Sequence, residues 1–368
     1  MNSLERFNAT MNYGPRDRAP FRELMWPASP ETAERWAREG GYLAETTDIH
    51  RYLGGQTDFG CDRWVVECSW FFPAPPFEHT IVAEDEETVT YVDPMGIVLR
   101  ELKEAPMSSM PQFIRFPVQT REDFRKYWKE RMRPDLTERL GSDWQEQLRR
   151  HRNRDSPLVV IADKWGGFFG QLRNLVGVER LCVLFYDDPS FLEEMMDADA
   201  EFQIAVLSRM LEETDIDVYA FWEDMAYKTA PLISPELVRK FMLPRYKKVI
   251  DFGRSRGVHF FALDSDGNVD SLIPVWMDAG IDILYPFEVQ AGMDVVALRK
   301  KYGRALRMWG GVDKRPLAEG PAAIDRELQR VAPLIQDGGF VPMLDHLATP
   351  DISYKNYCYF LDQLRKIL

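Results

Sequence analysis

The sequence predicts an α/β protein with a (β/α)8 TIM-barrel fold, and three observations support this. A chain of 368 residues, 45% of them hydrophobic, can bury the single large core that such a barrel needs. From about residue 157, short apolar runs alternate with amphipathic stretches, as in parallel strands joined by helical crossovers. Each run begins apolar and finishes polar, and the active sites of barrels lie at the carboxyl ends of the strands. We therefore expect one domain over residues 1–368.

Eight strands are expected from the apolar runs. The less regular N-terminal part supplies the first two strands, at 18–26 and 61–70. The other six runs are 157–163, 217–224, 258–267, 281–288, 305–313 and 339–346. Together they complete the number of strands in a barrel.

Helix signals and an insertion fill the remaining sequence. The stretch "SPELVRKFMLPRYKKVIDFGRSRG" opens with a Ser-Pro-Glu cap and ends at Gly257, and "NVDSLIPVWMDAG" and "PAAIDRELQRVAPLIQDGG" also close on glycine. Residues 79–101 alternate as antiparallel strands do, and residues 120–152 form a charged helical stretch. Residues 71–155 are therefore expected as an insertion of a hairpin and helices after the second strand.

Composition limits the partners and the compartment. The 46 Lys and Arg residues face 59 Asp and Glu residues, a net charge of −13, which disfavours nucleic acid and anionic membranes as partners. The sequence shows neither a run of about 18 apolar residues nor an apolar N-terminal stretch behind a basic segment, so we expect no membrane span and no secretory signal. The four cysteines form no CxxC pair. We expect a cytoplasmic protein that binds small molecules and proteins.

Acidic residues gather at the predicted strand ends, where they would share one mouth of the barrel. They are Glu223, Asp224, Asp264, Asp266, Glu288 and Asp345, followed by His346. Clustered carboxylates raise one another's pKa, and a bound cation or a shared proton relieves the repulsion. Each residue also has a structural alternative: "DSDG" is ordinary turn chemistry, Asp266 can cap a helix, and a single His is often structural.

Aromatic side chains near the same strand ends are candidates for the wall of a substrate pocket. They are Trp165, Phe168, Trp222, Tyr227 and Trp309. Aromatic residues also commonly fill a core without touching a ligand. Both interpretations remain open from the sequence.

Three stretches resemble the uroporphyrinogen decarboxylase superfamily. They are "LVGVERLCVLFYDDPSFLEEMMD", "WEDMAYKTAPLISPELVRKFMLPRYKKVI" and the C-terminal part from "MWGGVDKRPLAEG" through "GGFVPMLDHLATPDISYKNYCYFLDQLRKIL". The resemblance covers residues 155–368 well and the N-terminal part loosely, and it implies a (β/α)8 barrel. A barrel hosts many chemistries, so the fold alone does not give the reaction.

The decarboxylase branch of the superfamily is the less similar one. Its Met-Arg-Gln-Ala-Gly-Arg segment, whose arginines receive the substrate carboxylates, is replaced here by "FRELMWPASPETAERW". Arg16, Arg18 and Arg22 lie nearby, but not with the spacing of that motif. His346 does match the histidine of the family's last strand end, so decarboxylation of a porphyrinogen or another carboxylated substrate stays an alternative.

The other branch comprises corrinoid-dependent methyltransferases, which bind zinc through a His-x-Cys-Gly motif and a later Cys. In "DSDG", Asp264 replaces the His and Asp266 the Cys, while His346 falls at the final Cys. The substitutes still suit zinc or another divalent ion, and the harder ligands leave more positive charge for a substrate oxygen. Glu223 and Glu288 are expected to complete the shell.

The resemblance therefore implies an O-demethylase type of methyltransferase that moves a methyl group from a small methoxylated or methylated donor to a corrinoid protein. Asp345 would orient His346 or donate a proton, and Asp224 would join them at the catalytic site. Because "DHLATP" lacks the glycine of the Asp-x-His-x-x-Gly corrinoid signature, the corrinoid is expected in trans. A homodimer is a family expectation, and a non-catalytic ligand-binding barrel is a further alternative.

Overall fold

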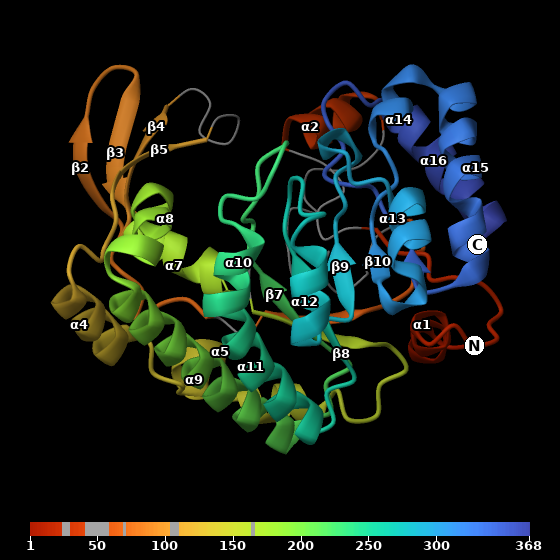
Figure 1. Cartoon of the computed structure of the whole chain (residues 1–368). Coiled ribbons are helices and arrows are strands. Elements are labelled where there is room, and N and C mark those ends of the chain that lie inside the picture. Colours follow the sequence, from red (N-terminus) through yellow and green to blue (C-terminus); the bar gives the residue numbers. More distant parts are fainter. Residues whose placement is uncertain (24–29, 41–58, 69–70, 104–109, 163–165) are drawn as a thin grey trace.

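The computed structural model describes residues 1–23, 30–40, 59–68, 71–103, 110–162 and 166–368. Within these ranges one sheet of seven parallel strands curls into a barrel-like α/β fold with helices outside it (Figure 1). In spatial order the strands are β1 (Val65–Cys68), β6 (Leu158–Ile161), β7 (Val218–Trp222), β8 (Phe260–Asp264), β9 (Ile283–Tyr285), β10 (Arg307–Trp309) and β11 (Phe340–Val341). The order follows the chain, as it does in a (β/α)8 barrel. The predicted fold class is confirmed.

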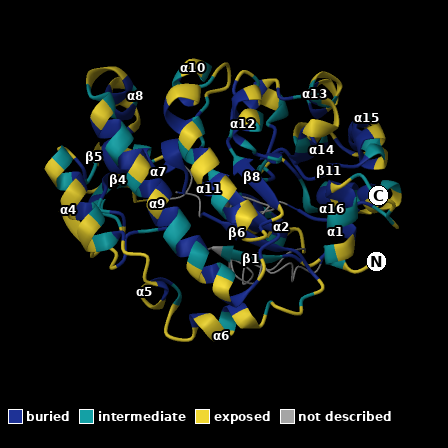
Figure 2. Cartoon of the chain, turned by 60° about the horizontal axis from the view of Figure 1, so that its bottom comes forward, coloured by how far each residue is buried: buried dark blue, intermediate teal, exposed yellow. Residues whose placement is uncertain are grey.

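Helices of the expected kind connect the strands. They are α7 (Phe168–Val176), α8 (Val178–Asp187), α9 (Pro189–Glu213), α10 (Pro235–Leu237), the π-helix η2 (Val238–Met242), α11 (Leu243–Ser255), α12 (Ile273–Ala279), the 3-10 turns η3 (Val289–Ala291) and η4 (Gly303–Ala305), α13 (Val295–Tyr302), α14 (Arg315–Glu319), α15 (Pro321–Asp337) and α16 (Tyr354–Ile367). Figure 2 shows α9 and α11 with exposed residues on their outer side and buried residues toward the sheet. Among the helices described, none has the length and apolarity needed to cross a membrane.

The expected first strand does not form over residues 18–23, and residues 24–26 lie outside the described ranges. Pro20 has no N–H for a ladder, and the N–H of Phe21 donates to the side chain of Asp62 at 2.8 Å. One backbone bond, from Asp62 N to Phe21 O at 2.7 Å, ties this segment to the residues before β1. At the other side, Ala19 N donates to the carbonyl of Leu368 at 3.1 Å. An extended segment therefore takes the place of a hydrogen-bonded strand here.

A second sheet lies between β1 and β6 in the chain. Its four antiparallel strands are β2 (Thr80–Glu84), β3 (Thr88–Val92), β4 (Val98–Leu102) and β5 (Gln112–Arg115), followed by α4 (Arg121–Arg131), α5 (Leu136–Leu140) and α6 (Trp144–Arg149). The alternating sequence at 79–101 predicted three of these strands, but not β5. Figure 1 shows this sheet at one side of the molecule, beside α8.

The N-terminal helices are α1 (Ser3–Met11) and α2 (Pro30–Arg38). Phe7 of α1 is fully buried and packs edge-on against Trp64, Phe260 and Trp309, with centroid distances of 5.2, 6.0 and 6.1 Å. The helix end is held by bonds from Gly339 N to Thr10 O and from Arg307 Nε to Met11 O. Helix α1 thus closes the end of the barrel at which the strands begin.

Removing the Phe7 ring tests this closure. We expect Phe7→Ala to lower the free energy of unfolding by about 3–5 kcal/mol, because a fully buried ring leaves a cavity. The control is Phe113→Ala, in which a side chain that is 44% exposed is removed, with a loss below about 1 kcal/mol. Denaturant unfolding measures both variants, and equal losses would contradict the role of α1.

A buried carboxyl group lies on α9 behind β7. Asp199 is 2% exposed, and its Oδ2 accepts a bond from Gln203 Nε2 at 2.8 Å, while Gln203 Oε1 accepts from Tyr219 at 3.0 Å. Burial raises the pKa of Asp199 from 3.8 to about 8. The folded protein therefore holds a proton that the unfolded chain releases near pH 4.

This proton makes stability depend on pH. Because the pKa is higher in the folded state, the free energy of unfolding should fall as pH rises from about 4 to about 8. We expect Asp199→Asn to remove about 2–4 kcal/mol of that fall between pH 5 and pH 8. Asp215→Asn, an exposed change close in the chain, should keep the wild-type slope. Unfolding measured at several pH values checks this, and a wild-type slope in Asp199→Asn would contradict it.

Candidate functional site

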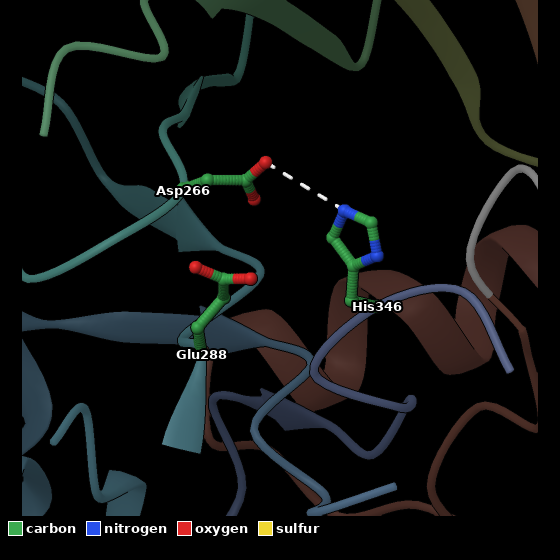
Figure 3. Close-up of side chains that lie close together, drawn as sticks. All are labelled: Asp266, Glu288 and His346. Atoms are coloured by element: carbon green, nitrogen blue, oxygen red, sulfur yellow. Dashed lines mark ion pairs between the residues drawn. The ribbon is translucent and has the colours of Figure 1, made fainter. Parts of the chain in front are cut away.

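Three of the predicted site residues meet at the carboxyl ends of the strands. Asp266 follows β8, Glu288 follows β9 and His346 follows β11 (Figure 3). One ligand atom from each residue lies within 4.8 Å of the corresponding atoms of the other two. His346 Nε2 lies 3.7 Å from Asp266 Oδ2, and both side chains are 38% exposed. Solvent can therefore reach these three side chains, and their ligand atoms point toward one another. We call Asp266, Glu288 and His346 the triad.

The loops that carry this triad are fastened to each other. Gly267 N donates to Glu288 Oε2 at 2.8 Å, so the turn after β8 fixes the side chain that follows β9. Gly267 has φ +79°, and a Cβ there would lie 2.7 Å from the carbonyl oxygens of Ala226 and Tyr227. Only glycine fits this close approach. The predicted "DSDG" turn thus serves both the turn and the site.

Asp345 has a structural role that differs from the prediction. It is 2% exposed, its Oδ2 accepts from Val289 N at 3.0 Å, and its Oδ1 accepts from Lys314 N at 3.2 Å. Burial raises its pKa. Both oxygens thus tie the loops after β9 and β10, and Asp345 supports the backbone beside Glu288 in place of the predicted contact with His346. Its role as a proton donor stays a prediction.

Negative charge dominates the electrostatics of this rim. The carboxylate of Asp266 raises the pKa of His346, while burial opposes the rise. Burial raises the pKa of Asp264 well above its ordinary value, and the charges of Asp266, Asp224 and Glu288 act in the same direction. The arrangement favours a cation at the triad, because a cation relieves carboxylate repulsion.

Asp264 was predicted as a metal ligand together with Asp266. It is the last residue of β8, it pairs in register with Trp222 of β7 and Tyr285 of β9, and it is not part of the triad. Its raised pKa favours the protonated form of the carboxyl group over the charged form that binds a metal ion. We therefore separate Asp264 from the ligand set and place it on the strand itself, below the rim.

Glu223 was predicted to be a metal ligand and a catalytic residue, and the structure corrects both expectations. Its side chain is fully buried, and its oxygens accept from the backbone N–H groups of Phe168, Phe169 and Gly170 at 2.6–2.9 Å. The hydroxyl of Tyr246 donates to the same carboxylate. Burial raises the pKa of Glu223 to about 7, against the opposing effect of these donors. Its carboxylate holds the N-terminus of α7, where negative charge is stabilising.

Asp224 lies at the rim and is held by an arginine that the sequence analysis did not single out. Arg173 of α7 lies 2.8 Å from Asp224 Oδ2, bonds the Asp224 carbonyl, and stacks over Trp222 at 4.7 Å. Asp224 has φ +40°, an unusual conformation for a residue other than glycine. Burial raises its pKa, and the charge of Asp266 acts in the same direction. No sequence motif marks Arg173, because the contact depends on how α7 docks.

The predicted aromatic wall is mostly core. Phe168 is fully buried against Tyr246, and Trp309, 4% exposed, packs on Trp64 and Tyr285 inside the barrel. Tyr227 is 72% exposed, so it forms no wall. Trp222 stays at the mouth under Arg173, and Trp165 lies outside the described residues. The pocket-wall assignment of Phe168, Trp309 and Tyr227 is therefore corrected.

Comparisons with known proteins show which family and which solved structures this chain is similar to. The family model described as "Uroporphyrinogen decarboxylase (URO-D)" matches residues 100–367. No curated protein matches the chain. A solved "methyltransferase from Methanosarcina mazei" superposes with a TM-score of 0.65 at 18% identity, covering 100% of this chain and 99% of that chain. A B12-independent methionine synthase from Shewanella sp. W3-18-1, in complex with selenomethionine, gives a TM-score of 0.45 at 12% identity over 95% of each chain. The likeness to the Methanosarcina mazei methyltransferase shows the fold of this chain.

The role of Glu223 as an acceptor for the backbone N–H groups at the start of α7 can be tested by replacing its carboxylate with an amide. Glu223→Gln turns an acceptor toward three backbone donors into an amide N–H₂, so we expect a loss of about 2–3 kcal/mol in the free energy of unfolding at pH 8. The amount of bound divalent metal should stay at the wild-type value, because Glu223 does not reach the triad. Glu319→Gln, at an exposed helix end, is the control and should change stability by less than about 0.5 kcal/mol. Loss of metal in Glu223→Gln would contradict this assignment.

Proposed function

The chain belongs to the uroporphyrinogen decarboxylase (URO-D) family, and from that premise we propose that it is a metal-dependent methyltransferase that transfers a methyl group from a small methoxylated or methylated donor to a corrinoid protein. The observation that carries the proposal is the triad of Asp266, Glu288 and His346. The likeness to a solved methyltransferase over the full chain supports the choice of this branch at the level of fold.

The residues present fit a divalent metal ion. Two carboxylates and one imidazole give an oxygen and nitrogen ligand set, which suits zinc and other divalent ions and leaves positions for a substrate. Other carboxylates near the triad, such as that of Asp224, lower the electrostatic free energy of a bound cation further. Asp266, Glu288 and His346 would hold the ion, and its chemistry would be to polarise the bond between the methyl group and its leaving oxygen by binding that oxygen.

The chain's own residues supply the setting for this reaction. Glu288 is oriented by Gly267 N, and Asp345 fixes the backbone that carries it, so two ligand-bearing loops are held before any ligand arrives. Asp264 ends β8 beside this triad, and burial together with the neighbouring acids raises its pKa, so it is the proposed source of a hydrogen bond to the leaving oxygen. Arg173 keeps Asp224 in a pair, which reduces the negative charge that a substrate meets.

The methyl acceptor in this proposal is a reduced corrinoid on a partner protein. The reduced corrinoid would supply the electron pair for the new bond to the methyl carbon, and the pair of the broken carbon–oxygen bond would stay on oxygen. The chain lacks the corrinoid-binding signature in its own sequence, which is why a separate protein is proposed as the carrier. The leaving oxygen would take up a proton from water to give the demethylated product.

The metal site is tested by elemental analysis of protein purified without a histidine tag. We expect close to one divalent ion per chain, and at least a tenfold weaker affinity for zinc in His346→Ala and Asp266→Asn, since each removes one of three ligands. His259→Ala is the control, because His259 lies at the start of β8, next to Asp217 and away from the rim.

Activity assays then separate the alternatives. Methyl transfer from methoxylated donors should require both metal and a reduced corrinoid protein, and it should be lost in His346→Ala. Decarboxylation of uroporphyrinogen by the metal-free protein would favour the carboxy-lyase alternative instead. A chain that binds no metal under any condition, or that keeps full activity in His346→Ala, would overturn the proposed function, and ligand binding without turnover would indicate a binding barrel.

A further inference from the structure

Arg173 of α7 bonds both the side chain and the backbone of Asp224. Its Nη2 atom lies 2.8 Å from Asp224 Oδ2, and its Nη1 atom donates to the carbonyl oxygen of Asp224. The Cζ atom of the same guanidinium lies over the ring of Trp222, 4.7 Å from the centroid. Asp224 adopts φ +40°, which few residues other than glycine adopt. One arginine therefore fixes both the backbone and the carboxylate of Asp224 at the rim.

Asp224 is the neighbour of the proposed metal ligand Asp266 on the adjacent strand. Trp222 pairs in register with Asp264, and Asp224 and Asp266 each follow this pair by two residues. The residue after Asp224 donates its backbone N–H to the hydroxyl of Ser265 at 3.1 Å, so the two chains stay side by side beyond the ladder. Adjacent strands lie ~4.8 Å apart, which brings the two carboxyl-bearing residues next to each other.

The Asp224 carboxylate nevertheless lies outside the triad. Among the described residues, the group whose ligand atoms lie within 4.8 Å of one another is Asp266, Glu288 and His346. A carboxylate beside a divalent ion is attracted to it, and a fourth protein ligand would close the shell, as in structural zinc sites. A catalytic site keeps that position open for water or substrate. Such a site therefore needs a restraint on Asp224.

We propose that Arg173 is a positioning residue that holds the Asp224 carboxylate away from the metal ion and thereby keeps a coordination position open for the methyl donor. The guanidinium neutralises the carboxylate, which weakens its attraction to a cation, and the second bond to the carbonyl oxygen keeps the backbone from turning. The inference rests on the proposed function for the presence of the metal ion. It adds the contact that leaves room for the substrate on that ion.

The test uses imidazole as a neutral probe of the open position, on the full chain loaded with Co²⁺. The visible absorption of Co²⁺ reports imidazole binding, and competition with a chelator gives the Kd of zinc. In Arg173→Met we expect imidazole to bind at least about tenfold more weakly and zinc at least about tenfold more tightly than in wild type, because Asp224 becomes a fourth ligand. Adding Asp224→Asn to Arg173→Met should return the imidazole Kd to within about threefold of wild type.

Arg245→Met is the matched control, because Arg245 of α11 also bonds a carboxylate and a backbone carbonyl. It donates to both oxygens of Asp197 at 2.8 and 2.9 Å and to the carbonyl oxygen of Phe241 at 3.1 Å. This variant should keep the wild-type Kd for imidazole and for zinc. The single variant Asp224→Asn tests the inference even if Arg173→Met does not fold. It should weaken zinc binding less than His346→Ala does, because Asp224 is not a ligand in the wild-type protein.

Three results would overturn the inference while the metal site stands. They are a wild-type Co²⁺ protein that binds no imidazole, unchanged imidazole binding in Arg173→Met, and a loss of zinc affinity in Asp224→Asn as large as in His346→Ala. If the imidazole and zinc results are as expected but no methyl group is transferred to a reduced corrinoid, the proposed function fails alone. A wild-type protein that binds neither ion would contradict both.

Discussion

The repulsion among carboxylates at one rim is the constraint on which the rest of this structure depends. A parallel sheet directs the carboxyl end of every strand to the same side, so acids placed after β7, β8, β9 and β11 inevitably meet. In water each of these charges is solvated, but at a half-buried rim each raises the free energy of the others. A barrel that keeps Asp224, Asp264, Asp266 and Glu288 together must therefore neutralise them with cations or protons.

The structure divides this neutralisation among different partners. Arg173 pairs with Asp224, the pKa of Asp264 is raised so that its neutral form is favoured, and backbone N–H groups donate to two buried acids near the strand ends, Glu223 and Asp345. Glycines allow this arrangement: a Cβ at Gly167 or Gly170 would lie 2.1 or 2.3 Å from the carbonyl oxygen of Trp222. That close contact brings the N-terminus of α7 onto the Glu223 carboxylate. Among the acids of the described part of the rim, those of the triad keep their charges facing one another.

Hydrophobic periodicity was sufficient to predict the sheet, because the alternation of apolar runs and helices is a local property of the sequence. It failed at residues 18–23, where Pro20 and the bond from Phe21 to Asp62 replace a ladder. The triad could be predicted as well, since Asp266, Glu288 and His346 follow their strands closely. The sequence did not allow a prediction of the direction in which a side chain points. Glu223 and Asp224 are adjacent acids after one strand, yet one faces α7 and the other the rim, and only the docking of α7 decides which.

The same constraint relates the metal site to the substrate. Charges at the rim act on each other over a few ångström, so a metal ion and an anionic group of a substrate would not bind there independently. An anionic group that approaches without a metal ion is repelled by Asp266 and Glu288, and a metal ion held by these two carboxylates would remove that repulsion. Each ligand would therefore strengthen the binding of the other by the same factor, since coupling between two ligands is reciprocal. The acids that favour a cation at the triad thus also determine which charge a second ligand needs there.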